Sequence, residues 1–466
     1  MRTDPVFLTT EIRRIERDAG NVSPPLMERA GNAAAEFSMG LISEKSKDVL
    51  VLAGPGNNGG DARIAAQRLQ EKFFRVAVAS SPEEIPAERD WGLVVDGLFG
   101  IGLARDIAGP HALLVDYANR QRCPVLALDV PSGIHADTGR VLGRAVRATH
   151  TITFIGLKPG LLTLDGPDHA GEISVSTLDL SLPAASAWVA APSLFREALR
   201  RRPRNFHKGQ AGSLAVLGGA AGMTGAALLA GRAALKLGAG KVFLGVLEED
   251  FPDVDFLMPE LMIHHVDDAL GLDLDAMVVG PGLGDSERAE TVLGAALASE
   301  IPCVLDADAL NLLAENPSFR EACARRTAQT IVTPHPAEAA RLLGSNVAAV
   351  QADRVKAARM ISENLNAHAV LKGNGSIVAA RDGHWFVNTT GNPGMASAGM
   401  GDVLAGLLGA LLAQRYSGEF SAVLGTHLHG AAADALVRDG TGPIGLTASE
   451  VADASRKLWN AWLAEK

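Results

Sequence analysis

The sequence predicts an α/β protein with two domains, each built on a largely parallel sheet. From about residue 48 onward, short apolar segments alternate with helical segments, which is the pattern of parallel strands covered by helices. The chain has 466 residues, enough for two or more domains of roughly 100–200 residues each. Fifty glycines and an aromatic content of only 5% favour close packing of helices on sheets.

The first half of the chain begins with helices and then alternates. Residues Thr9–Ile42 are amphipathic and predict one or two helices, with a break near Asn21. Strands are predicted at Asp48–Ala53, Phe74–Ala79, Leu93–Asp96, Val125–Asp129, Thr151–Phe154 and Glu172–Val175, with helices at Asp61–Glu71 and Pro110–Arg120.

A change of composition between Leu182 and Lys208 predicts the domain boundary. We place the first domain at residues 1–195 and the second at residues 196–466. The arginines from Arg196 to Arg204 predict a solvated face or, alternatively, a contact with nucleotide phosphate. In the second domain strands are predicted at Ser213–Leu217, Lys241–Val246, Ala276–Val279, Cys303–Leu305, Thr330–Val332 and Ala369–Leu371, with helices at Thr224–Leu237 and beginning at Asp402 and His427.

Charge and cysteine usage narrow the class of protein. The net charge of −10 argues against a surface dominated by phosphate contacts, so no nucleic-acid partner is expected. Cys123, Cys303 and Cys323 are far apart and lack metal-ligand spacing, which favours a reducing, cytoplasmic location. Residues 209–231 lack charge, but their glycines and strand–turn–helix pattern favour a globular segment, so no membrane partner is expected.

Glycine-rich turns and carboxylates follow three strands of the first domain. Gly54–Asp61 reads GPGNNGGD, in which glycines allow close approach of a ligand and Asn57, Asn58 and Asp61 supply polar contacts. Asp96 and Asp129 stand at two further strand ends. Ligands of parallel sheets bind beyond the carboxyl ends of strands, so these groups predict one binding rim.

The segment Asn388–Gly401 is a glycine-rich loop that leads directly into an apolar helix at Asp402. Such a junction points several backbone N–H groups at one place and predicts an anion site. Asp402 is either a base that faces the anion or only the N-cap of the helix. We expect the helix dipole to favour the ionised form of its carboxylate.

Other turns of the second domain carry candidate ligands. Asp306, Asp308 and Asn311 are either metal-associated or helix caps. Prolines on both sides of His335 restrict its backbone and favour a ligand contact. Lys372–Ser376 combines a cation, glycines and a hydroxyl, which predicts a nucleotide-phosphate cradle without the Walker pattern.

The motifs of the first domain together resemble the N-terminal domain of NAD(P)H-hydrate epimerases, over residues 10–179. The resemblance implies a Rossmann-like three-layer α/β/α fold and a potassium ion near Asn58, Asp96 and Ser132. It implies Asp129 as the acid–base residue, with Lys158 as a second one or as a phosphate contact. Ala62 and Ile101 depart from the family pattern, which places a glycine and a polar residue there. The residues implied to contact the hydrated nucleotide are Asn57, Asn58, Gly59, Gly60, Asp61, Gly100, Ile101, Gly102, Leu103, Ala104, Arg105, Asp106 and Asp129.

The second domain is similar to the ribokinase-like ADP/ATP-dependent NAD(P)H-hydrate dehydratases, over residues 206–455. The motifs that carry the resemblance include HKGQAGSLAVLGG, TPHPAEAARLLG, LKGNGS and NPGMASAGMGD. It implies a ribokinase-like α/β/α fold and Mg²⁺ beside the nucleotide. The residues implied at the hydrate are Ala226, Gly284, His335 and Asp402, and those implied at the adenine nucleotide are Lys372, Gly373, Asn374, Gly375, Ser376 and Gly401.

The two resemblances imply one bifunctional enzyme, an isomerase joined to a carbon–oxygen lyase. It is expected to epimerise the R and S forms of hydrated NAD(P)H and to dehydrate the S form through a phosphorylated hydrate. ADP is the expected phosphoryl donor, ATP the less favoured one, and a homo-oligomer is expected. The alternative is a ribokinase-type small-alcohol kinase fused to a non-catalytic nucleotide-binding module.

Overall fold

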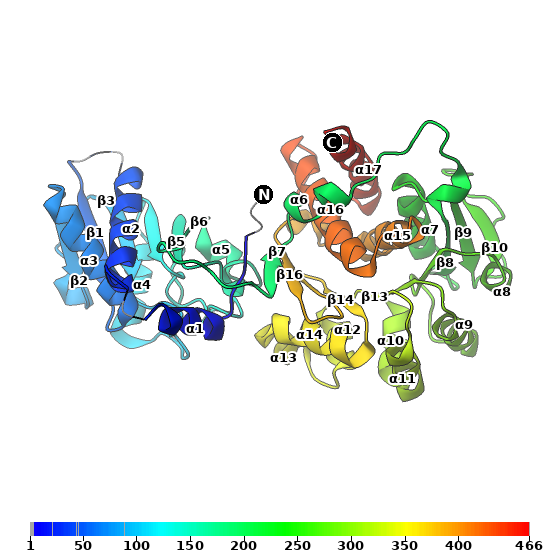
Figure 1. The fold of residues 1–466 in the computed structure, drawn as a ribbon, viewed down its shortest axis with the longest axis horizontal. Helices are drawn as coiled ribbons and strands as arrows, with labels where there is room; N and C mark the ends of the chain where they lie inside the picture. Colours follow the sequence, from blue (N-terminus) through cyan, green and yellow to red (C-terminus); the bar gives the residue numbers. More distant parts are fainter. Residues whose placement is uncertain (1–3, 21, 43, 45, 88, 466) are drawn as a thin grey trace. The chain divides into compact units, whose positions relative to one another are not determined.

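The computed structural model describes residues 4–20, 22–42, 44, 46–87 and 89–465 of the chain (Figure 1). These residues form two compact units, Asp4–Trp188 and Val189–Lys466. The units meet between Trp188 and Val189, whereas the sequence placed the boundary after residue 195. The predicted helix break near Asn21 lies outside the described residues.

The N-terminal unit contains a six-stranded parallel sheet in the order β2-β1-β3-β4-β5-β6. Because β1 connects to β2 on one side and is flanked by β3 on the other, the strand order reverses between β1 and β3. Ligands of doubly wound sheets bind at such a switch point. The strands are β1 (Asp48–Ala53), β2 (Val76–Ala79), β3 (Trp91–Gly97), β4 (Val125–Leu128), β5 (His150–Phe154) and β6 (Glu172–Ser176).

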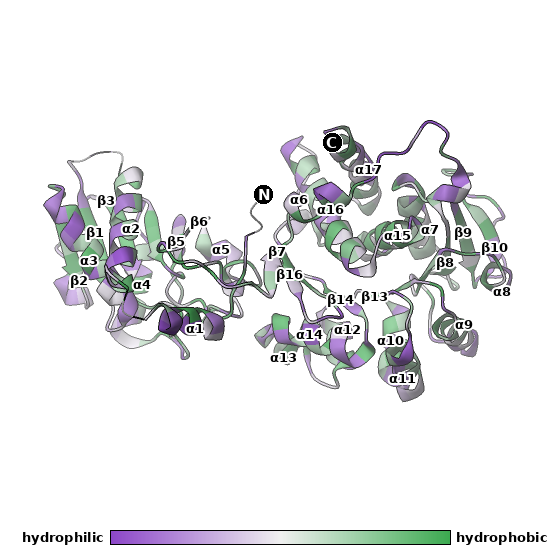
Figure 2. Cartoon of the chain, viewed as in Figure 1, coloured by the Kyte–Doolittle hydropathy of each residue, from purple (hydrophilic) through white to green (hydrophobic). Residues whose placement is uncertain are grey.

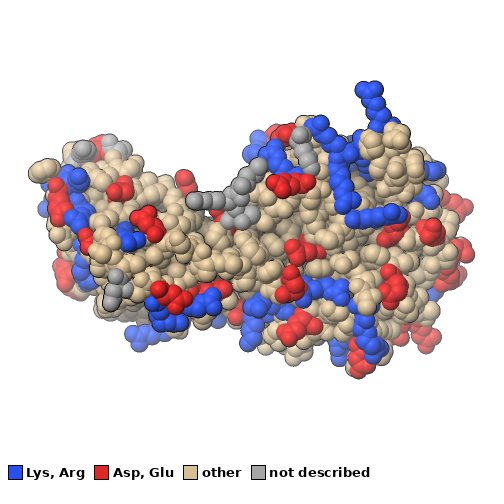
Figure 3. Space-filling model, viewed as in Figure 1, with Lys and Arg blue, Asp and Glu red and all other residues tan. Residues whose placement is uncertain are grey.

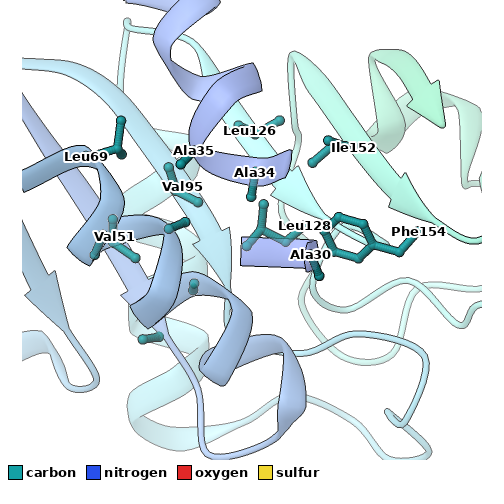
Figure 4. Close-up of a cluster of buried hydrophobic side chains, with 14 of the residues drawn as sticks. Ala30, Ala34, Ala35, Val51, Leu69, Val95, Leu126, Leu128, Ile152 and Phe154 are labelled. Atoms are coloured by element: carbon teal, nitrogen blue, oxygen red, sulfur yellow. The ribbon is translucent and has the colours of Figure 1, made fainter. Parts of the chain in front are cut away.

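Helices cover both faces of this sheet and bury its alternating side chains. On one face α1 (Thr9–Ala19), α2 (Leu26–Leu41) and α3 (Asn57–Glu71) pack on the strands. Figure 4 shows Leu128 and Phe154 of the sheet beside Ala30 of α2. The other face is covered by α4 (Gly109–Asn119). The prediction of a three-layer α/β/α unit is therefore confirmed, although α3 begins at Asn57 and not at Asp61.

The sheet of the C-terminal unit has ten strands in the order β10-β9-β8-β11-β12-β13-β14-β15-β16-β7. Strands β10 to β14 along this order are parallel, and β15 and β16 add antiparallel neighbours. The strands are β7 (Ala187–Val189), whose last residue is the first of the unit, β8 (Ser213–Gly218), β9 (Lys241–Val246), β10 (Met262–His265), β11 (Ala276–Val279), β12 (Cys303–Leu305), β13 (Thr330–Val332), β14 (His368–Leu371), β15 (Ser376–Ala379) and β16 (Trp385–Asn388).

Helix α15 (Met400–Ala413) is the central helix of this unit and is buried around most of its circumference. Its glycines allow close packing, because a Cβ at Gly406 would overlap the backbone of Ala230 in α7 (Thr224–Lys236). Figure 2 shows apolar residues concentrated along this helix and the strands. The remaining main helices are α6 (Pro192–Phe195), α8 (Val266–Leu270), α9 (Glu287–Ala298), α10 (Asp308–Glu315), α11 (Pro317–Arg325), α12 (Pro336–Leu342), α13 (Val347–Ala352), α14 (Arg354–Leu365), α16 (Gly418–Arg438) and α17 (Ala448–Ala464).

Two predicted helix starts are wrong. Helix α15 begins at Met400, two residues before Asp402, and α16 begins at Gly418, well before His427. In α16 the side chain of Ser417 accepts a hydrogen bond from the N–H of Phe420, which is an N-cap that the sequence analysis overlooked.

The arginines after the boundary are exposed but also make specific contacts. Arg201 donates to the carbonyls of Leu463 and Ala464 at the C-terminal end of α17, at 3.0 and 2.9 Å. The Arg202 guanidinium lies 4.7 Å from the centre of the Phe206 ring. Acidic and basic side chains are interspersed over most of the face in Figure 3. None of the described helices has the length and apolar character that crossing a bilayer requires.

Candidate functional site

A cavity of about 670 Å³ opens at the carboxyl ends of the strands in the N-terminal unit. It coincides with the switch point of the sheet, because the turns after β1 and β3 form much of its wall. Helices α1 and α2 supply the rest. Its lining residues are Ile12, Arg13, Glu16, Leu26, Met27, Ala30, Pro55, Gly56, Asn57, Asn58, Asp61, Leu98, Phe99, Gly100, Ile101, Gly102, Leu103, Ala104, Arg105, Asp129, Phe154, Ile155 and Leu178.

Glycines let the two turns approach each other at this point. A Cβ at Gly54 would overlap the carbonyl of Leu98, and a Cβ at Gly59 would overlap the carbonyl of Gly54. At Gly100 a Cβ would lie 3.3 Å from both the Asn58 Cγ and the Asp129 Oδ2. Most of the residues that sequence reasoning assigned to the nucleotide therefore lie on this wall; Gly59, Gly60 and Asp106 do not line the cavity itself.

Asp129 is held at the end of β4 by a buried lysine. The ammonium of Lys158, which has no exposed surface, pairs with Asp129 Oδ1 and also donates to Thr153 Oγ1 and the carbonyl of Phe154, at 2.8 and 2.7 Å. Asp129 itself has a φ of +67°, a left-handed conformation uncommon outside glycine. The structure thus brings together the two predicted acid–base residues, and it makes Lys158 a partner of Asp129.

Two further carboxylates face the same cavity. Burial raises the pKa of Asp61 to about 8, and the negative charges of Asp129 and Glu16 add to the shift. The pKa of Glu16 is also raised, mainly by burial and then by Asp129, although Lys158 and Arg13 oppose this. Sequence reasoning missed Glu16, because an acidic residue on an amphipathic helix gives no distinguishing signal.

Of the predicted potassium ligands, Asp96 and Ser132 are in contact with each other and do not line the cavity, whereas Asn58 lies on its wall. Asp96 is fully buried and accepts hydrogen bonds from Ser132 N and Oγ at 2.8 and 2.6 Å. Burial raises the pKa of Asp96 to about 6, and these hydrogen bonds oppose the shift. Asn58 is buried, and among the described residues neither its Oδ1 nor its Nδ2 finds a hydrogen-bond partner. Unused oxygen acceptors of this kind fit a hard cation.

The departure from the family pattern at Ala62 is accommodated without strain. Ala62 lies within helix α3 and is completely buried. Its methyl group occupies the space beside Gly97, where a second Cβ would overlap it. Ile101, by contrast, is half-buried and lines the cavity.

In the C-terminal unit, Asp402 lies in the first turn of α15 but does not cap it. The N-cap is Gly399, with φ +85°, and no side chain caps the helix. Asp402 accepts no hydrogen bond from the described part of the chain. Burial raises its pKa to about 6, Asp306 and Asp308 contribute, and Lys372 opposes them. The capping alternative is therefore wrong. The helix dipole was expected to favour the ionised form of Asp402, but burial and Asp306 give its pKa a net upward shift.

Lys372 stands beside the start of this helix and is held by two carboxylates. Its ammonium lies 2.8 Å from Asp306 Oδ1 and 3.9 Å from Glu338 Oε2. Burial would lower the pKa of Lys372, but Asp306 and Glu338 outweigh it and raise the pKa. A Cβ at Gly401 would lie 3.3 Å from the Lys372 Nζ, so the ammonium and the helix N-terminus are adjacent.

His335 serves as the N-cap of helix α12. Its Nδ1 accepts from the N–H groups of Ala337 and Glu338 at 3.0 and 3.3 Å, and its Nε2 lies 3.2 Å from Glu338 Oε1. Burial lowers the pKa of His335, with Lys372 and Arg341 contributing. Burial raises the pKa of Glu338 to about 7, and Lys372 opposes the shift. Sequence reasoning named His335 but assigned no role to Glu338.

Hydrogen bonds connect the segments that follow β11, β12 and β13. They involve Asp306, Asp308 and Gly284. Asp306 also accepts from Thr333 Oγ1 at 2.7 Å, and Asp308 accepts from the Gly284 N–H at 2.9 Å. Neither aspartate is an N-cap, since Ala307 occupies that position of α10. The turn Lys372–Ser376 closes on itself, because Ser376 Oγ donates to the Gly373 carbonyl at 2.9 Å. Ala226 lies half-buried in the first turn of α7.

The loop before α15 is hydrogen-bonded to Asp434 of α16, a carboxylate that sequence reasoning missed. Asp434 accepts from the Gly391 N–H and from Asn392 Nδ2, both at 2.9 Å. Thr390 Oγ1 donates to the His427 carbonyl at 2.9 Å. Asp434 is remote in sequence from the loop, so only the fold reveals this contact.

Comparison with known families agrees with both halves. Residues 214–457 match the family described as NAD(P)H-hydrate dehydratase. Residues 23–92 and 79–160 match the family described as the YjeF-related protein N-terminus.

Relatives with both halves are similar over nearly their whole length. A bifunctional NAD(P)H-hydrate repair enzyme of Coxiella burnetii is 38% identical, over 98% of this chain and 99% of that protein. One of Escherichia coli is 37% identical, over 99% and 95%. The crystal structure of an ADP/ATP-dependent NAD(P)H-hydrate dehydratase from Bacillus subtilis with ATP/Mg²⁺ is 28% identical, with a TM-score of 0.52, over 59% of this chain and 98% of that one. The chain belongs to the family of bifunctional NAD(P)H-hydrate repair enzymes.

Proposed function

We propose that this chain restores hydrated NAD(P)H in two steps, one on each unit. The N-terminal unit, Asp4–Trp188, interconverts the R and S hydrates, and the C-terminal unit, from Val189 onward, dehydrates the S form at the expense of ADP. The observation that carries the proposal is Asp402, a half-buried carboxylate without a hydrogen bond from the described residues, at a helix N-terminus beside Lys372. An unengaged base next to an anion site suits phosphoryl transfer from a nucleotide to a hydroxyl.

The dehydratase step follows from this arrangement. Hydroxide is a poor leaving group, and phosphorylation of the hydrate hydroxyl converts it into a good one. Asp402 takes the hydroxyl proton while the N–H groups of Gly399–Gly401 and the Lys372 ammonium stabilise charge on the transferred phosphoryl group. With a pKa of about 6, Asp402 is ionised at neutral pH yet retains basicity, which general-base catalysis needs. Loss of phosphate, together with a proton from the neighbouring ring carbon, then forms the C=C bond and restores the dihydropyridine ring.

Metal ions fit the two sites differently. The described residues contain no group of three His, Cys, Asp or Glu side chains arranged to hold a metal. A Mg²⁺ ion at the dehydratase site would therefore be held largely by nucleotide phosphates, as is usual for Mg²⁺, and would offset their charge. In the first unit Asn58, Asp96 and Ser132 would hold K⁺. The ion would fix the turns after β1 and β3 around the hydrate.

The remaining assignments in this proposal follow the family. Asp129 is the acid–base residue of the epimerase, and Lys158 holds its carboxylate in position through the buried ion pair. The wall from Asn57 to Asp61 and from Gly100 to Asp106 binds the hydrated nucleotide. Ala226, Gly284 and His335 contact the hydrate in the second unit, and Lys372–Ser376 with Gly401 contact ADP, with ATP as the weaker donor. We further propose a cytoplasmic homo-oligomer.

Separated R and S hydrates test the function directly. The full chain with ADP and Mg²⁺ should convert both to NAD(P)H, seen as the return of the reduced-nicotinamide absorbance. Turnover with ADP should exceed that with ATP. Accumulation of a stable phosphorylated alcohol, without return of that absorbance, would instead support the small-alcohol kinase.

A further inference from the structure

The wall of the N-terminal cavity is formed partly by the strand ends of the sheet and partly by helices outside the sheet. Asp61 and Asp129 come from the strand-end rim of the sheet, after β1 and β4. Helix α1 contributes Ile12, Arg13 and Glu16 from outside the sheet. Among the described lining residues, Glu16 is the one carboxylate that does not belong to the rim.

Helix α1 is fixed in place at its N-terminal end. Thr9 donates to Asp137 through its N–H at 2.7 Å and through its hydroxyl at 2.6 Å. Glu11 accepts from the Leu8 N–H at 2.8 Å, and Ile12 and Ile15 are buried in the core. Glu16 is therefore presented to the cavity by a rigid element, which precise proton transfer requires.

Epimerisation of the hydrate needs proton transfer on two faces of one carbon. The hydroxyl-bearing carbon is bonded to the ring nitrogen, so its C–O bond can break as the nitrogen lone pair forms a C=N bond. The departing oxygen must gain a proton to leave as water. A water that adds to the opposite face must lose one, so one acid and one base are required.

The groups around Glu16 suit the role of the acid. Four charged groups interact with Glu16. Asp129 lies at the end of β4 and is paired with Lys158, Arg13 lies on α1 like Glu16, and Asp61 lies on α3. Asp129 Oδ1 is already engaged by the Lys158 ammonium, which positions this carboxylate as the proton acceptor. Desolvation at the cavity wall, and after it the charge of Asp129, raise the pKa of Glu16 and favour its protonated form, although Lys158 and Arg13 oppose the shift.

On the basis of the proposed function, we infer that Glu16 is a second catalytic residue of the epimerase and acts on the face that Asp129 does not serve. In one direction the Glu16 carboxylic acid gives its proton to the departing hydroxyl, which leaves as water. A second water adds to the other face and gives its proton to the Asp129 carboxylate. The proton then returns from Asp129 to Glu16 through cavity water, and no oxidant or reductant is consumed.

The full chain supplies its own control for this inference. With ADP and Mg²⁺ in excess, R-hydrate turnover requires both units, whereas S-hydrate turnover requires only the dehydratase. In Glu16→Gln, kcat for the R hydrate should fall about 100-fold or more, with little change in KM and none in S-hydrate turnover. Glu16→Asp should recover part of the rate. Asp18→Asn, on the same helix but not on the cavity wall, should match wild type.

Three outcomes would overturn the inference. One is wild-type R-hydrate turnover in Glu16→Gln, and another is a loss confined to KM, which would make Glu16 a binding residue. A third is an equal loss of S-hydrate turnover, which would indicate damage to the whole protein. Failure of the wild-type chain to convert the R hydrate, while it converts the S hydrate, would instead refute the proposed epimerase.

Discussion

Both sites place a lysine against an aspartate, but with opposite consequences for the base. In the N-terminal unit, Lys158 pairs with Asp129 itself and so fixes the position of the proposed base. In the C-terminal unit, Lys372 pairs with Asp306, and the proposed base Asp402 lies beside that pair with a pKa raised to about 6. The first arrangement engages the proposed base in a buried ion pair, whereas the second leaves it without a hydrogen bond from the described residues.

The comparison teaches that a buried lysine does not have one role in such sites. Lys158 is completely buried, and its ammonium donates hydrogen bonds to Asp129, Thr153 and Phe154. It therefore has no donor left for a ligand. An ammonium has three donors, and all three are used. This removes the alternative that Lys158 contacts phosphate. Lys372 is partly exposed and adjoins a helix N-terminus, so it can meet an anion.

The largest effect on turnover is expected when the unpaired base, Asp402, is removed. Asp402→Asn keeps the shape of the side chain but cannot accept the hydroxyl proton, so S-hydrate turnover should fall by about 100-fold to 10,000-fold. ADP affinity, measured by calorimetry, should change little, because the N–H groups and Lys372 remain. Near-normal turnover in this variant would show that Asp402 is not the base and would remove the contrast between the two sites.

The next effect concerns the paired base. Lys158→Met leaves Asp129 in a buried position without its counter-charge, and loss of one partner of a buried pair costs about 3–5 kcal/mol. Urea unfolding of the N-terminal unit should shift accordingly, and R-hydrate turnover should be lost with S-hydrate turnover kept. Lys47→Met, which breaks the surface pair with Asp90, should leave the unfolding curve close to wild type. Equal shifts in the two variants would contradict the role of the buried pair.

A smaller effect is expected in the pH profile of the dehydratase. The base must be deprotonated, and the pKa of Asp402 is raised to about 6, so kcat for the S hydrate should rise with pH and level off above about 6. Asp306 contributes to that raised pKa, and Asp306→Asn should therefore move the rising limb to lower pH. A limb that stays in place or moves upward would show that Asp306 does not act on Asp402.

Sequence reasoning found the strand ends well and the tertiary partners poorly. Glycine-rich turns after buried strands identify Asn58, Asp129 and Asp402, because local chain pattern fixes where a strand ends. Glu16, Glu338 and Asp434 act through residues far away in the chain or from the exposed face of a helix, and their local sequence resembles any solvated helix. The raised pKa of Asp402 was also not predictable, because it depends on burial and on Asp306, which the chain brings near only on folding.

The smallest expected effect tests whether Ala62 weakens the first site. Ala62→Gly restores the family's glycine, but Ala62 lies inside α3, where glycine is less favourable than alanine by roughly 0.8–1.0 kcal/mol. The variant should lose about that much unfolding free energy in urea, with R-hydrate turnover unchanged. Gly97→Ala, which would overlap the Ala62 methyl group, provides the matched contrast and should be more destabilising. A faster epimerase in Ala62→Gly would mean that the alanine restricts the turn, whereas unchanged turnover would show that this position serves packing alone.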